Sequence, residues 1–129
     1  MKKIKIVFTV AVLMLAFGAC KYDFIIPEEA PPVDPNASEV SFSQKVLPIF
    51  TTGNNCTACH KTGGTSPDLT AANAYNVINN AKYINIANPS GSKIYSVAAP
   101  STSEHSHKKY TATEAVIVLS WITQGAKNN

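Results

Sequence analysis

Arginine is absent from this chain of 129 residues, so its 11 basic side chains are all lysines. Arginine supplies many of the contacts through which proteins bind phosphates and read bases, and the lysines here form no dense run. Eight acidic residues leave a formal net charge of only +3. The composition therefore argues against a nucleic acid as a partner.

No apolar stretch reaches the roughly 20 residues that a membrane-spanning helix needs. The longest one, residues 6–17, follows three lysines and precedes a pair of small residues. This order is typical of a secretory signal peptide, so we expect residues 1–19 to be removed on export.

Cysteine is scarce, with three residues in the chain, and the first of them, Cys20, directly follows the predicted signal. Residues 16–20 resemble a bacterial lipobox, except that Phe17 replaces the usual aliphatic residue. We expect Cys20 to carry a lipid that anchors the exported protein to a membrane, facing the periplasm or the cell surface. The alternative is ordinary cleavage that leaves Cys20 unmodified.

Residues 20–38 contain four prolines and four acidic residues, a composition that opposes both helices and sheets. We expect them to form an extended tether. Residues 39–129 hold 7 lysines against 4 acids and have the length of one small domain.

The remaining cysteines lie in the sequence Cys56-Thr57-Ala58-Cys59-His60, the C-x-x-C-H pattern of covalent haem attachment. Two thiols at this spacing can form thioethers with the two vinyl groups of one haem, and the next imidazole can then ligate the iron. We therefore expect Cys56 and Cys59 to hold one haem c and His60 to be its proximal ligand.

Two other uses of these cysteines fit less well. A closed zinc site needs four ligands, which the mature chain could supply only by adding His105 or His107 to the motif. A thioredoxin-like thiol pair needs a strand before it, whereas the flanking residues read as loop.

Methionine is missing after Met14, so no methionine of the mature chain can be a sixth iron ligand. His105 and His107 are the remaining candidates, and spacing does not separate them. Histidine in place of methionine would lower the reduction potential, because a thioether favours ferrous iron. If neither binds, the iron has an open position that could take a gas or a peroxide.

The pattern predicts an all-α fold of three to four short helices packed around the haem. One helix opens with a capping box at 41–44, is kinked or shortened by Pro48, and ends at 53–55. Two more are expected at 71–80, capped by Thr70, and at 92–98.

The clearest helix opens with a second capping box at 111–114 and ends at Gly125. Its residues 115–122 are almost wholly apolar, so we expect burial on several sides, with Trp121 packed against the first helix. About 90 residues arranged in this way bury little apolar area alone, and haem would complete the core.

Residues 40–129 resemble the small monohaem cytochrome c domains of exported proteins from Bacteroidetes-type bacteria. The matching stretches, besides C-x-x-C-H, are 40–42, 46–50, 67–69, 92–95 and 121–129. The resemblance implies a cytochrome c fold with crossed terminal helices, and a Pro67 carbonyl that bonds the proximal imidazole. The chain departs from the family before the last helix, where His105-Ser106-His107 stands in place of the usual methionine.

These features favour a carrier of single electrons between redox partner proteins, not an enzyme. Lys61, Lys108 and Lys109 could attract acidic partners. The alternatives are a haem peroxidase or oxidoreductase subunit with an open iron site, and a haem module that binds a gas.

Overall fold

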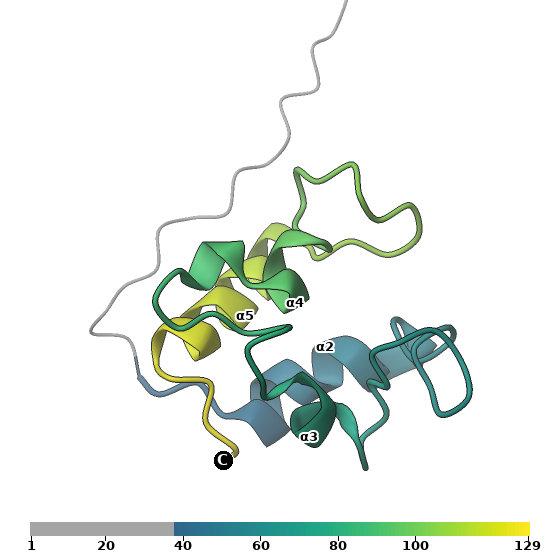
Figure 1. Cartoon of the computed structure of the whole chain (residues 1–129), viewed down its shortest axis with the longest axis horizontal. Helices are drawn as coiled ribbons and strands as arrows, with labels where there is room; N and C mark the ends of the chain where they lie inside the picture. The colour runs from purple at the N-terminus through teal and green to yellow at the C-terminus, as the bar shows by residue number, and fades with distance from the viewer. Residues whose placement is uncertain (1–37) are drawn as a thin grey trace, which may run out of the picture.

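The structure, a computed structural model, describes residues 38–129. This part of the chain is helical, with long loops and no strand, so the predicted all-α class is confirmed at that level (Figure 1). The predicted signal peptide, Cys20 and the tether up to residue 37 lie outside the described residues. Among residues 38–129, no helix has the length and apolar character needed to span a membrane.

The N-terminal helical segment changes its winding at Pro48. A π-helical turn, η1 (Phe42–Val46), leads directly into α2 (Leu47–Thr51). Pro48 lies in the first turn of α2, where the missing proline N–H costs little. The disturbance predicted at Pro48 is thus seen as a change of winding between η1 and a short α2. The hydroxyl of Ser41 caps the segment by accepting from the N–H of Gln44 at 3.3 Å.

The last helix, α5 (Ala112–Thr123), has the ends that the sequence predicts. Thr111 and Glu114 form a complete capping box. At the C-terminus, the N–H of Gly125 donates to Ile122 and that of Ala126 to Trp121, the two bonds of a Schellman motif. Gly125 has φ +96°, a conformation that glycine adopts without strain.

The middle helices are shorter than predicted. The helix expected at 71–80 with Thr70 as its cap is α3 (Ala74–Ile78), with Asn73 at the N-cap position. Thr70 instead bonds the Asp68 carboxylate through its N–H and hydroxyl, which fixes a turn before the helix. The helix expected at 92–98 is α4 (Lys93–Ser96), preceded by a 3₁₀ turn, η3 (Pro89–Gly91).

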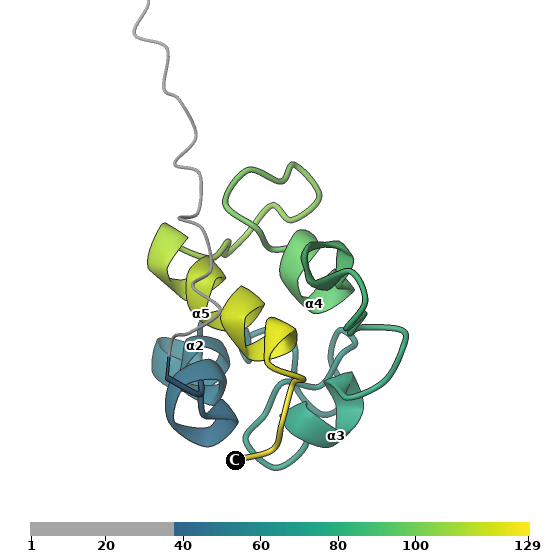
Figure 2. The same ribbon diagram turned by 90° about the vertical axis from the view of Figure 1, so that its left-hand side faces the viewer.

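The core lies where η1, α2 and α5 pack together (Figure 2). Trp121 is 1% exposed, and its ring centroid lies 5.3 Å from that of Phe42, so the predicted contact with the first helix is confirmed. Val46, Phe50 and Ile122 are fully buried in the same cluster. Each such side chain contributes about 1.5–3 kcal/mol on burial.

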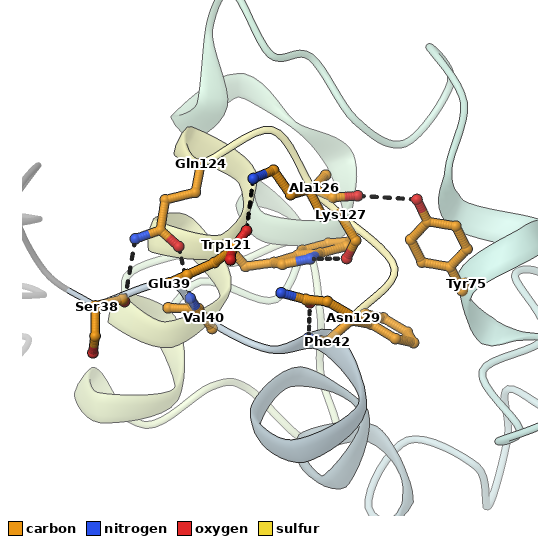
Figure 3. A network of polar contacts seen from close by, with 10 residues as sticks. All are labelled: Ser38, Glu39, Val40, Phe42, Tyr75, Trp121, Gln124, Ala126, Lys127 and Asn129. Atoms are coloured by element: carbon orange, nitrogen blue, oxygen red, sulfur yellow. Dashed lines mark hydrogen bonds and ion pairs between the residues drawn. The ribbon is translucent and has the colours of Figure 1, made fainter.

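The two ends of the described chain are tied together by a terminal clasp, which we define as residues 38–43 and 124–129 (Figure 3). The Val40 N–H donates to Gln124 Oε1 at 2.7 Å, and the Phe42 N–H donates to Asn129 Oδ1 at 2.8 Å. Lys127 and Glu39 form an exposed ion pair at 2.7 Å. The loops after α2 and before α5 lie at the other end of the molecule, on the right of Figure 1.

Replacing Thr111 by alanine should lower the free energy of unfolding by about 1 kcal/mol, because an N-cap hydroxyl is lost. Urea denaturation of the full-length protein measures this change. Thr113→Ala is the matched control, since Thr113 is an exposed residue inside α5 where alanine is a good helix former. Equal losses in the two variants would contradict the capping role.

Candidate functional site

Cys56, Cys59 and His60 lie on one helical turn that follows α2 and a short 3₁₀ turn, η2 (Thr52–Asn54). The N–H of His60 donates to the Cys56 carbonyl at 2.8 Å, and that of Cys59 to the same carbonyl at 3.2 Å. Residues separated by three and four positions on such a turn share one side. The turn therefore presents both thiols and the imidazole together, with Cys56 and His60 half-buried and Cys59 exposed.

The imidazole of His60 is held by its own loop. Its Nδ1 lies 3.2 Å from the carbonyl oxygen of Pro67, which is the contact that the family resemblance implies. The Leu69 N–H donates to the His60 carbonyl at 2.9 Å. A hydrogen bond from Nδ1 leaves Nε2 available as a ligand and fixes the orientation of the ring.

Two residues that the sequence analysis missed shape this loop. A Cβ on Gly64 would lie 2.4 Å from the Cys59 carbonyl, so only glycine lets the chain pass there. The carboxylate of Asp68 accepts from the hydroxyls of Thr62 and Thr70, from the Thr70 N–H and from the amide of Asn73. The Gly63-Gly64 pair and the D-x-T pattern at 68–70 are the signals that could have indicated them.

The two thiols are unpaired with one another and differ in environment. Burial raises the pKa of Cys56, and the nearby Lys108 partly offsets this effect. Cysteines that act as nucleophiles in thiol exchange have a lowered pKa. Burial of Cys56 thus disfavours the thiolate form that such a nucleophile needs.

Two adjoining cavities border the motif and share Cys56, His60, His105 and Lys108. The first has about 670 Å³ of empty space, part of which is open to solvent. The second has about 620 Å³. Apolar side chains form much of the first cavity's wall: Pro67, Leu69, Ile94, Val97 and Ala98.

Three of these wall residues come from α4 and the residues after it, and the sequence analysis did not assign them a role. Ile94, Val97 and Ala98 are spaced by three and four positions, as on one face of a helix. The Tyr110 hydroxyl, fully buried, donates to the Ile94 carbonyl at 2.7 Å and fixes this segment against the start of α5. Burial also raises the pKa of Tyr110 well above its ordinary value.

The structure separates the two candidate distal histidines. The ring centroid of His105 lies 6.1 Å from that of His60, and the ring planes are 22° apart. Nδ1 of His105 is buried without a hydrogen-bond partner. His107 is exposed and lines only the second cavity.

The lysines expected to attract partners are engaged in different ways. Lys108 pairs with Glu114 at 3.4 Å, and the ammonium of Lys109 donates to the Thr102 carbonyl. Both contacts brace the loop that carries the histidines. Lys61 is exposed beside the motif.

The chain matches no model of a known protein family, no curated protein and no solved structure. Within residues 38–129, no three His, Cys, Asp or Glu side chains lie close enough together to hold a metal ion by themselves. The arguments about function therefore rest on the residues and geometry described above.

Replacing Gly64 by alanine should lower the free energy of unfolding by about 1–3 kcal/mol, because the added methyl group must displace backbone. Hydrogen exchange should also accelerate at the Thr65 and Leu69 amides, which bond the Cys59 and His60 carbonyls. Thr65→Ala changes an exposed side chain in the same loop and should leave both quantities nearly unchanged. Slow exchange in Gly64→Ala would show that the close approach is not required.

Asp68→Asn should destabilise the protein most at neutral pH. Hydrogen bonds hold the pKa of Asp68 well below its ordinary value of 3.8, so the ionised form stabilises the folded state above that pH. This contribution is lost as the pH falls below 3.8 through the folded-state pKa. The difference in unfolding free energy between wild type and variant should therefore shrink from pH 7 to pH 3.

Glu104→Gln is the control for the loss of a negative charge alone, because Glu104 is an exposed acidic residue that lines the second cavity. Its effect should be small at every pH. A difference for Asp68→Asn that stays constant with pH would contradict the role of the ionised carboxylate.

Proposed function

We propose that this protein is an exported c-type cytochrome that carries single electrons. One haem would be attached through Cys56 and Cys59, with His60 as the proximal ligand. The observation that carries the proposal is the single helical turn that brings both thiols and this imidazole to the edge of two adjoining cavities.

The residues around the cavities fit a haem. Two thiols supply thioether sites, the imidazole of His60 supplies a nitrogen ligand, and the Pro67 carbonyl orients that imidazole. A hydrogen bond from Nδ1 to a carbonyl also raises the basicity of the ligating nitrogen. The unpartnered Nδ1 of His105 on the facing side is a polar atom whose burial costs about 1–3 kcal/mol unless something compensates it.

When bound, haem supplies an iron that gains and gives up one electron. The protein would provide the low-polarity wall of Leu69, Ile94 and Val97, which excludes water from the iron's surroundings. Cys59 is exposed, so one edge of the group would lie close to the surface where a partner protein can approach. Electron transfer to a partner requires no catalytic side chain beyond these.

The fold supports the same proposal. The N-terminal helical segment packs against the C-terminal helix through Phe42 and Trp121, as expected for the terminal helices of a cytochrome c domain. The haem-attachment motif follows the N-terminal helical segment, and the loop at residues 99–110, which carries His105, precedes α5. The mildly basic composition of residues 39–129 favours acidic redox partners.

Lipidation of Cys20 belongs to the same proposal, because it would keep the carrier at a membrane after export. A lipid chain together with a second membrane-binding signal gives stable anchoring, whereas one chain alone gives reversible binding. Lipoprotein acylation would add more than one chain at this cysteine.

The test is to express the full chain in a host with a haem-attachment system. We expect haem that survives denaturing gels and acid-acetone extraction, with sharp low-spin bands in the reduced spectrum. Cys56→Ala combined with Cys59→Ala should abolish covalent haem, since both thioether sulfurs are lost. Cys20→Ala is the matched control, which should retain haem and lose membrane association.

Absence of covalent haem in the wild type would overturn the proposal and return the two thiols to zinc or disulfide chemistry. A high-spin spectrum would overturn the electron-carrier function in favour of an open iron site, as in a peroxidase or a gas-binding module.

A further inference from the structure

We propose that His105, and not His107, is the second axial ligand of the iron, so that the site is bis-histidine. This inference rests on the proposed function, and it assigns a ligand that the sequence leaves open between two residues. Four observations on the loop at residues 99–110 carry it.

The first observation is the separation of the two rings. The centroids of His60 and His105 are 6.1 Å apart, and no hydrogen bond joins the rings. Two imidazoles on opposite sides of one metal ion have centroids roughly 6 Å apart, because each metal–nitrogen bond is roughly 2 Å and each nitrogen lies about 1 Å from its ring centre. The centroid separation of His60 and His105 matches that of two such ligands.

The second observation is the environment of the His105 side chain. Its Nδ1 is buried without a partner, which is unusual because buried polar atoms are nearly always hydrogen-bonded. Both cavities that border the haem-attachment motif are also lined by His105. The His105 side chain as a whole is half-buried, so a half-buried imidazole with one buried, unpartnered nitrogen borders both cavities, which is the position expected of a ligand.

The third observation is that His107 lacks these features. It is exposed, borders only the second cavity, and has no ring contact with His60 in the described part of the chain. The two histidines are only two residues apart, so the loop directs one inward and the other outward. His107 therefore serves as a matched control.

The fourth observation is that the loop is braced on both sides of His105. Before it, the Thr102 N–H donates to the Ala99 carbonyl at 3.1 Å, and the Lys109 ammonium returns to the Thr102 carbonyl. After it, the Tyr110 N–H donates to the Ala98 carbonyl at 2.8 Å. These bonds close the loop that carries His105 onto the residues that follow α4.

The geometry also predicts a spectroscopic property. Ring planes 22° apart are nearly parallel. Both imidazoles would then interact with the same one of the two iron d orbitals available for π bonding, and the two orbitals would differ in energy. The oxidised protein should then give an ordinary rhombic low-spin electron paramagnetic resonance signal. Perpendicular ring planes would leave the two orbitals nearly equal in energy and give a low-spin signal with a large maximum g value instead.

The experiment compares His105→Ala with His107→Ala in the full-length protein carrying covalent haem. His105→Ala should lose the low-spin bands, become high-spin and bind carbon monoxide when reduced, and added imidazole should restore the low-spin spectrum. His107→Ala should keep the wild-type spectrum and reduction potential. In both variants, haem staining after denaturation should match the wild type, because Cys56 and Cys59 are intact.

His105→Met is a second variant that keeps a ligand at the same position, in case the alanine variant fails to mature. It should remain low-spin, show a methionine-to-iron charge-transfer band and have a higher reduction potential than the wild type.

Covalent haem with an unchanged low-spin spectrum in His105→Ala would overturn this assignment and leave the proposed function standing. So would a high-spin His107→Ala. A wild type without covalent haem would overturn the proposed function itself, and this inference with it.

Discussion

The packing of the N-terminal helical segment against α5 is the contact on which the rest of the structure depends. Phe42 and Trp121 form its centre, with ring centroids 5.3 Å apart, and the indole N–H donates to the Lys127 carbonyl. The loop carrying His60 starts where α2 ends, and the loop carrying His105 finishes where α5 begins. The relative position of these two helices therefore determines how the two imidazoles face each other across the cavity.

Between these helices the chain has little regular structure, so short-range hydrogen bonds and ion pairs stabilise its conformation. Asp68 gathers hydrogen bonds from three side chains and a backbone amide, and it thereby fixes the neighbouring Pro67 carbonyl beneath His60. On the opposite side of the cavity, Lys108 and Lys109 stabilise the loop at residues 99–110 through Glu114 and the Thr102 carbonyl. Residues that look like surface charges in the sequence are thus the supports of the site.

Local signals explain what could be predicted from the sequence. The ends of α5 depend on residues within one turn of each other, and both caps are present where the capping box and Gly125 indicate them. The predicted start of α3 was wrong, because the carboxylate of Asp68 binds the N–H and hydroxyl of Thr70. Helix periodicity in the sequence carries no information about such a local side-chain bond. Which of the two histidines lies beside His60 could not be predicted from the sequence. The position of this loop depends on how it closes through the Tyr110–Ala98 hydrogen bond, which joins residues 12 positions apart.

The terminal clasp has a consequence for how the protein would stand at a membrane. The clasp fixes Val40 and Phe42 to α5 and the C-terminal residues, at the end of the molecule opposite the two site loops (Figure 1). A chain anchored through Cys20 would enter the domain at that far end. The two site loops would then lie at the end of the domain away from the point of attachment, where a partner protein in the aqueous compartment can reach them.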